Sequence, residues 1–155
     1  MATQRSSIKR IVVGIDGSAQ SAAAIKWAVR LAKGMGSQIT AVFAIHMPIY
    51  FASEYGAPFQ YDQQWRDEMK AEFETKWCKP LRVSGVRYRT VMEDGRPASV
   101  IGAVADREKA DLIVVGRRGR GDVAELVLGS VSHELVLNSK RPVLVISPEK
   151  SRARN

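Results

Sequence analysis

Residues 11–18 read Ile-Val-Val-Gly-Ile-Asp-Gly-Ser, a continuous apolar run that ends on an acidic residue, a glycine and a serine. An uninterrupted apolar run of this length is typical of a strand that is covered on both faces of a sheet. Ser18 is suited to cap a following helix, because its hydroxyl can accept a hydrogen bond from a free N–H group of the first turn. The stretch therefore predicts a buried parallel strand followed by a helix.

The same alternation of strand-like and helix-like stretches continues to the end of the chain. We expect strands over residues 11–15, 39–45, 85–93, 111–115 and 142–147, and helices over residues 18–33, 62–81, 97–109 and from residue 126 or 129 to residue 138. Strands that alternate with helices are usually parallel and joined by crossover helices. The sequence thus predicts an α/β fold, a five-stranded parallel sheet sandwiched by four helices. It forms one domain of residues 1–148, followed by a basic tail of residues 149–155.

The first two expected helices each carry an apolar side. The first has Ala22, Ile25, Val29 and Ala32 at helical spacing, and the second has an aromatic-rich stripe every four residues: Trp65, Met69, Phe73 and Trp77. A stripe of this kind predicts core packing. Residues 46–62 contain prolines, a glycine and several aromatic residues, which indicates a loop that folds over a ligand or a second subunit.

Composition restricts the class of protein. Of the 155 residues, 45% are hydrophobic and 26% are charged, which is ordinary for a soluble globular protein. No apolar stretch approaches the roughly 20 residues that cross a bilayer, and the N-terminus lacks a signal-peptide core, so we expect a cytoplasmic location and no membrane partner. Cys78 is the only cysteine, and His46 and His133 are the only histidines. A disulfide within the chain is therefore excluded, and a cysteine- or histidine-rich metal site is disfavoured.

The net charge of +8 raises the question of a nucleic-acid partner. Much of that charge lies near the two ends of the chain, where basic residues are usually solvated. The densest basic cluster elsewhere is residues 117–120, Arg-Arg-Gly-Arg, inside a glycine-rich stretch. This distribution favours an anion bound locally and disfavours nucleic acid, although association through the basic ends remains an alternative.

Residues 115–130 are the most informative stretch for function, reading Val-Gly-Arg-Arg-Gly-Arg-Gly-Asp-Val-Ala-Glu-Leu-Val-Leu-Gly-Ser. Gly116 and Gly119 allow backbone N–H groups to approach an anion. Residues 129–132 open a helix, whose first N–H groups favour a phosphate. Each part alone suits an ordinary turn or cap. Together, at the carboxyl end of a parallel strand where ligands usually bind, they predict an anion site.

The spacing Gly116, two residues, Gly119, nine residues, Gly129-Ser130 resembles the nucleotide-binding signature of the ATP-binding universal stress proteins. Residues 11–18, 95–97, 110–116 and 141–145 are also similar to landmarks of that family, and the resemblance covers about residues 8 to 148. It implies an adenine nucleotide alpha-hydrolase-like, Rossmann-like fold. It further implies bound ATP, with Mg²⁺ accompanying the phosphates although no carboxylate cage is visible, and a homodimer that pairs through its last strand at residues 143–146.

The resemblance also implies roles for single residues. Asp16 matches an acidic residue that contacts the nucleotide near its sugar, and a carboxylate suits the two ribose hydroxyls; stabilising the helix start is the alternative role. Ile45 matches a position whose backbone reads the adenine edge. Arg118 and Arg120 have a phosphate role on charge alone. The expected nucleotide contacts are Gly14, Ile15, Asp16, Ile45, Gly116, Arg117, Arg118, Gly119, Arg120, Gly129, Ser130, Val131 and Ser132.

No catalytic residue is predicted. The sequence lacks the Gly-x-x-x-x-Gly-Lys-Ser/Thr loop of P-loop NTPases, the Ser-Gly-Gly-x-Asp-Ser turn of ATP pyrophosphatases and a Gly-x-Ser-x-Gly nucleophile elbow. His46 has no visible carboxylate partner, and His133 is interpreted as a surface or dimer-contact residue. The favoured hypothesis is a regulatory stress-response module in which bound ATP changes what partner proteins contact. The alternative is a slow ATPase or a phosphotransfer enzyme that uses Ser130 or Ser132.

Overall fold

The computed structural model describes residues 7–46, 63–118 and 128–147. The elements are β1 (Arg10–Gly14), α1 (Ala19–Met35), β2 (Gln38–Ile45), α3 (Gln63–Glu72), η1 (Phe73–Trp77, a π-helix), α4 (Lys79–Arg82), β3 (Tyr88–Asp94), α5 (Pro97–Arg107), β4 (Leu112–Gly116), α6 (Ser130–Asn138) and β5 (Val143–Ile146). All pairings are parallel, in the order β3-β2-β1-β4-β5, so the predicted five-stranded parallel sheet is confirmed. Most of the aromatic-rich loop (residues 47–62) and the basic tail lie outside the described residues.

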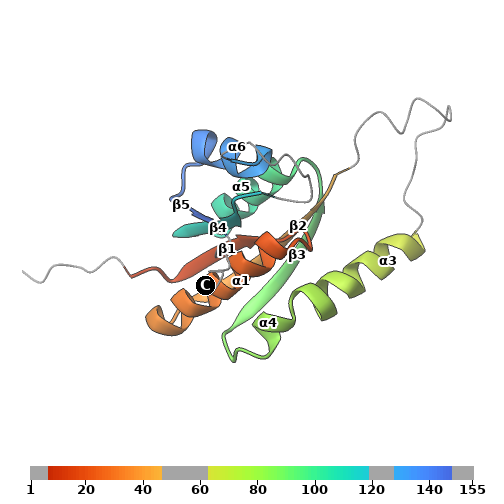
Figure 1. The fold of residues 1–155 in the computed structure, drawn as a ribbon, viewed down its shortest axis with the longest axis horizontal. Helices are drawn as coiled ribbons and strands as arrows, with labels where there is room; N and C mark the ends of the chain where they lie inside the picture. Colours follow the sequence, from red (N-terminus) through yellow and green to blue (C-terminus); the bar gives the residue numbers. More distant parts are fainter. Residues whose placement is uncertain (1–6, 47–62, 119–127, 148–155) are drawn as a thin grey trace, which may run out of the picture.

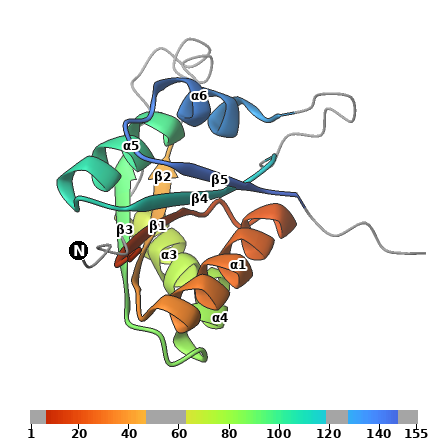
Figure 2. The same cartoon turned by 90° about the vertical axis from the view of Figure 1, so that its left-hand side faces the viewer.

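Helices cover both faces of the sheet. Helices α1, α3 and α4 lie against one face, and α5 and α6 lie against the other (Figures 1 and 2). Because side chains alternate along a strand, Ile11 and Val13 of β1 join the hydrophobic cluster under α1, whereas Val12 joins the cluster under α5. None of the helices in the described ranges has both the length and the apolarity that a membrane span requires.

The first helix begins at the predicted Ser18 cap and ends at a glycine. The Ser18 hydroxyl accepts a hydrogen bond from the Ser21 N–H at 3.1 Å, and Gly36 ends α1 with a φ of 67°, donating its N–H to the carbonyl of Ala32. The buried side is rotated relative to the prediction. It consists of Ser21, Ala24, Ile25, Ala28 and Ala32, and the expected Ala22 and Val29 are only half-buried. The rotation places a polar residue, Ser21, against the end of β1.

The prediction of a single helix over residues 62–81 is wrong. Helix α3 gives way to the π-helical turn η1, where the Cys78 N–H donates to the carbonyl of Phe73, five residues earlier, before the short α4 begins. The aromatic-rich stripe is nevertheless part of the core. Phe73 is fully buried, and the other three members are half-buried against the same cluster. The ring of Phe43 on β2 lies 5.6 Å from that of Phe73 and 5.0 Å from that of Trp77.

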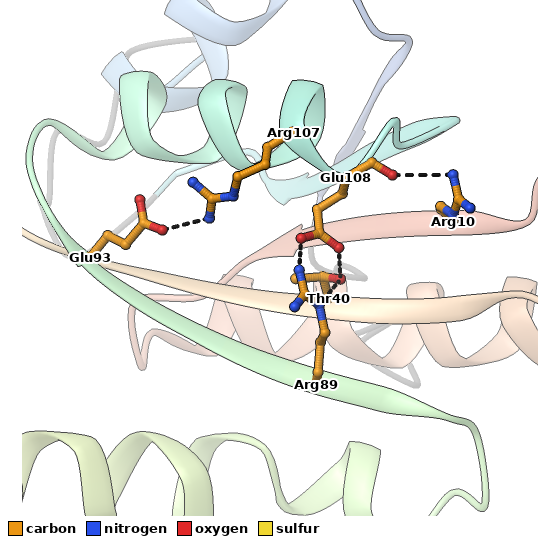
Figure 3. Close-up of polar contacts among 6 residues, drawn as sticks. All are labelled: Arg10, Thr40, Arg89, Glu93, Arg107 and Glu108. Atoms are coloured by element: carbon orange, nitrogen blue, oxygen red, sulfur yellow. Dashed lines mark hydrogen bonds and ion pairs between the residues drawn. The ribbon is translucent and has the colours of Figure 1, made fainter.

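The C-terminal end of α5 is fixed to the sheet by polar contacts on the α5 face (Figure 3). The Glu108 carboxylate pairs with Arg89 of β3 and accepts a hydrogen bond from the Thr40 hydroxyl of β2 at 3.4 Å, while Arg10 of β1 donates to the Glu108 carbonyl at 3.4 Å. These contacts come from three neighbouring strands. They fix one end of α5 and therefore constrain where its other end, at Pro97, meets the opposite edge of the sheet.

Candidate functional site

A cavity of about 420 Å³ opens at the carboxyl edge of the sheet. β1 and β4 are neighbours there, and the chain that leaves β1 enters α1 on one face while the chain that leaves β4 leads to α6 on the other. Ligands of parallel sheets bind at such a divergence, and the volume suits a small molecule. The cavity is lined by Gly14, Ile15, Asp16, Ser21, Val42, Ala44, Pro97, Ile101, Val115, Gly116, Arg118, Leu128, Gly129, Ser130, Val131 and Ser132.

The turn after β1 supplies the first polar wall. The carboxylate of Asp16 accepts a hydrogen bond from the Ser18 N–H at 2.9 Å, and the Asp16 N–H donates to the buried Ser21 hydroxyl at 3.4 Å. Asp16 is half-buried and lines the cavity. The turn therefore holds a carboxylate, a hydrogen-bond acceptor, in a fixed position at the cavity wall.

The end of β4 supplies the second wall. A Cβ atom on Gly116 would lie 2.9 Å from the backbone carbonyl group of Gln20 in α1, so only glycine fits at this close approach. The backbone N–H of Arg118 donates to the Gln20 side-chain oxygen at 2.7 Å, and Arg118 lines the cavity. Arg117 does not line it; its N–H donates to the carbonyl of Ile146 on β5 at 2.8 Å. Its contribution is thus to fix the backbone between β4 and the cavity.

The start of α6 supplies the third wall. Gly129 caps the helix, and its N–H donates to the carbonyl of Arg117 at 2.8 Å. The hydroxyl of Ser132 lies 2.8 Å from that same carbonyl and is buried, so it is used within the protein. Ser130 lines the cavity and is exposed. Of the two lining serines, Ser130 is therefore the exposed one, beside the N–H groups that open α6.

The remaining lining is apolar and comes from the α5 face of the sheet. Val42, Ala44, Pro97, Ile101 and Val115 form it, next to the polar walls. A Cβ on Gly14 would lie 2.7 Å from the Ile101 side chain and 3.1 Å from that of Val115. A larger residue at position 14 would therefore clash with the apolar lining. These apolar residues were not among the predicted contacts. The available signal was the alternation along β2, which turns Val42 and Ala44 to the same face.

Ile45, the residue expected to read an adenine edge, does not line the cavity. Its side chain packs in the cluster under α1, on the opposite face of the sheet, and its carbonyl accepts a hydrogen bond from the Gly95 N–H on the β3 side. Backbone groups alternate sides along a strand, so Ala44 turns its N–H and carbonyl toward β1, whose pairing with β2 ends at Gly14–Val42. Ala44 is therefore the residue of β2 whose backbone faces the cavity.

Gly119 and Arg120 lie outside the described residues. Among the residues that the structure does describe, no group of three or more His, Cys, Asp or Glu side chains is placed to hold a metal ion. The described residues that can face a ligand are thus one carboxylate, one hydroxyl, one arginine and a set of backbone groups, beside an apolar wall.

Comparison with known sequences gives a consistent group of relatives. Residues 7–147 match the family model described as the universal stress protein family. Universal stress protein MJ0531 of Methanocaldococcus jannaschii is 31% identical over 142 residues, covering 92% of this chain and 84% of the relative. Universal stress protein YxiE of Bacillus subtilis is 31% identical over 144 residues, covering 88% and 97%.

Solved structures of similar fold lead to the same group. UspA from Lactobacillus plantarum superposes with a TM-score of 0.70 at 25% identity, covering 90% of this chain and 97% of that one. A universal stress protein in complex with cAMP gives a TM-score of 0.70 at 24% identity, covering 92% and 98%. One from Archaeoglobus fulgidus in complex with dAMP gives 0.66 at 20% identity, covering 90% and 98%. The fold is thus the adenine nucleotide alpha-hydrolase-like fold implied by the sequence resemblance.

Proposed function

This chain belongs to the universal stress protein family, and from that premise we propose that it binds an adenine nucleotide in the cavity at the carboxyl edge of the sheet. One observation carries the proposal: the cavity joins an apolar wall to a fixed carboxylate and a helix start. A planar base, a sugar hydroxyl and a phosphate chain match those three surfaces. The similar proteins in complex with cAMP and dAMP support the same class of ligand.

The proposed arrangement assigns one part of the nucleotide to each wall. The base lies against Val42 and Ile101, with the backbone of Ala44 at its polar edge. The ribose hydroxyls donate to the carboxylate of Asp16. The phosphates lie at the start of α6, where Ser130 and the first N–H groups of the helix donate to their oxygens.

We further propose that the physiological nucleotide is ATP and that Mg²⁺ accompanies it. The support is the charge at the phosphate end, where Arg118 lies beside the start of α6 and Gly119 and Arg120 follow in sequence. Because the described residues offer no cluster of metal-ligating side chains, the ion would be held mainly by phosphate oxygens and water. Its contribution would be to neutralise charge between neighbouring phosphates.

Calorimetric titration with ATP, AMP, cAMP and adenosine tests the proposal. Asp16→Ala is expected to weaken binding of ATP, AMP and adenosine by roughly ten- to a hundredfold, because it removes charge-assisted hydrogen bonds to the ribose hydroxyls. The loss for cAMP should be smaller, because its 3′-oxygen is esterified and only one ribose hydroxyl can donate. Asp67→Ala, at an exposed carboxylate on α3, is the matched control and should leave affinity unchanged. Absence of binding to the unaltered protein at millimolar nucleotide would refute the proposal.

The role that follows is a regulatory module of the stress response, in which the occupied cavity changes the surface that partner proteins contact. A slow ATPase or phosphotransfer activity is the second candidate, favoured by the exposed hydroxyl of Ser130 at the phosphate end. Phosphate release should then fall in Ser130→Ala and in Gly119→Val. Release that persists unchanged in both variants would identify a contaminating enzyme and remove this candidate.

We also propose one binding unit over residues 1–148 that acts in the cytoplasm as a homodimer joined through β5. β5 is the edge strand of the sheet, and its apolar side chains Val143, Leu144 and Val145 are half-exposed. Val136 and Leu137 on the neighbouring α6 are 51% and 67% exposed. Light scattering on Val145→Lys, expected to be monomeric, tests the interface; an unaltered protein that is monomeric at micromolar concentration would contradict it.

A further inference from the structure

Gln20 links two parts of the molecule that are far apart in the sequence. It lies in the first turn of α1, and its side-chain oxygen accepts the Arg118 N–H at 2.7 Å, across 98 positions of the chain. Its backbone carbonyl is also the group that a Cβ on Gly116 would meet at 2.9 Å. Gln20 therefore contacts the chain leaving β4 through both its backbone and its side chain.

The segment that Gln20 holds is fixed on its other side by α6 and β5. The carbonyl of Arg117 accepts the Gly129 N–H and the Ser132 hydroxyl, each at 2.8 Å, and the Arg117 N–H donates to Ile146. The start of α6 is thus tied to Arg117, and the next residue, Arg118, is tied to α1. Gln20 is the side chain that completes the connection between the wall carrying Asp16 and the wall carrying the helix start.

We infer that Gln20 is a positioning residue that sets the geometry of the phosphate end of the cavity. The inference rests on the proposed nucleotide binding. Gln20 is not among the residues that line the cavity, so it acts through the backbone of Arg118. A backbone held in place before binding loses less conformational entropy when phosphate arrives. Gln20 should therefore matter for ligands that carry phosphates and not for adenosine, which carries none.

Gln20→Met is the decisive variant, because it keeps the length of the side chain and removes the accepting oxygen. Gln38→Met is the matched control: Gln38 is exposed at the amino end of β2, on the opposite edge of the sheet. In calorimetric titrations, Gln20→Met should raise the dissociation constant for ATP roughly three- to tenfold, the worth of one hydrogen bond. The constant for adenosine should change by less than about twofold, as should both constants in the control.

Amide hydrogen exchange measured without nucleotide gives an independent readout. The Arg118 N–H should exchange faster in Gln20→Met, by a factor similar to the loss of ATP affinity. It should remain slow in Gln20→Glu, whose carboxylate keeps an accepting oxygen at the same distance from the helix. This measurement follows the contact itself and does not depend on whether a nucleotide binds.

Several results would overturn the inference. Tighter ATP binding by Gln20→Met would mean that Gln20 competes with phosphate for the Arg118 N–H. Unchanged ATP affinity, or an equal loss for ATP and adenosine, would show that Gln20 does not act at the phosphate end. Each of these leaves nucleotide binding by the unaltered protein intact, so it rejects the role of Gln20 alone; failure of the unaltered protein to bind ATP rejects the proposed function and this inference with it.

Discussion

The two faces of the sheet are built from the same strands and differ in how completely they are filled. Under α1, α3 and α4, the rings of Phe43, Phe73 and Trp77 pack against one another and close the layer. Under α5 and α6, smaller side chains such as Val42 and Ile101 leave a cavity at the carboxyl edge. One face of the sheet is thus closed by aromatic rings, whereas the other keeps an open cavity, where we propose that a nucleotide binds.

The largest expected loss of stability comes from removing an aromatic ring from the face of the sheet under α1, α3 and α4, the closed face. Phe73→Ala should lower the free energy of unfolding by about 3–5 kcal/mol, because it removes a fully buried ring and leaves a hole among aromatic neighbours. Urea denaturation measures the loss. Val83→Ala, at a side chain that is 71% exposed, is the control and should change stability by less than about 0.5 kcal/mol. A loss below about 1 kcal/mol for Phe73→Ala would mean that this face is not closed by its aromatic rings.

A smaller loss is expected where α1 meets the cavity wall. Gly116→Ala should cost about 1–3 kcal/mol, because the new methyl group meets the backbone of Gln20, which cannot rotate away. The control is Gly102→Ala in α5, where a Cβ meets nothing within 4 Å and alanine favours the helix. Thermal denaturation should therefore show opposite shifts for the two variants. Equal shifts would contradict the close approach between α1 and β4.

A larger side chain in the cavity on the α5 face should weaken nucleotide binding with little effect on stability. Ala44→Leu places a larger side chain in the apolar part of the cavity and should weaken ATP and adenosine alike, by roughly tenfold. The free energy of unfolding should stay within about 1 kcal/mol of the original, because the added groups enter existing space. Ala103→Leu, on the exposed side of α5, is the control for both measurements. A stability loss as large as that of Phe73→Ala would remove the distinction between the faces.

The smallest effect is expected at an ion pair between α3 and the last residue of β3. Arg66 and Asp94 form two contacts of 2.8 Å, with side chains 28% and 59% exposed, so Arg66→Gln should cost less than about 1 kcal/mol. Hydrogen bonding from Arg66 holds the pKa of Asp94 below its ordinary value. A lowered pKa in the folded state adds stability above the unfolded pKa, and that stability is lost as pH falls through the folded pKa.

Urea denaturation at two pH values checks this sign. The difference between the original protein and Arg66→Gln should be present near pH 7 and should shrink as pH falls through the folded pKa of Asp94, where that carboxyl becomes protonated. A difference that grows on acidification would show that Arg66 stabilises the protein by contacts other than its pair with Asp94.

Most of the fold could be predicted from the sequence because its signals are local. The apolar runs at residues 11–15 and 111–115 indicate strands buried on both faces, and Ser18 marks the start of α1 through its own hydroxyl. The break in the helix predicted over residues 62–81 was also signalled locally, since Pro80 has no backbone N–H to donate within a continuous helix. The position of the π-helical turn was not, because the aromatic-rich stripe keeps a regular spacing through it.

The site was harder to predict because it depends on which residues the sheet brings together. The glycines and serines within residues 116–132 predict an anion site by their composition. Whether Ile45 or Ala44 turns its backbone toward the cavity depends on how β2 pairs with β1 and β3. No local sequence pattern contains that pairing. Gln20 meets Arg118 across 98 positions, and the apolar wall combines β2, β4 and α5. Each of these follows from tertiary structure alone.

The buried thiol of Cys78 gives the closed face a reporter of its own. The side chain has no exposed surface, and burial raises its pKa to about 12, so an alkylating reagent meets an inert, hidden sulfur in the folded state. Modification then proceeds only through molecules whose helical layer has momentarily lifted from the sheet. With a single cysteine in the chain, the alkylation rate of the purified protein reports how often those openings occur, without any engineered label.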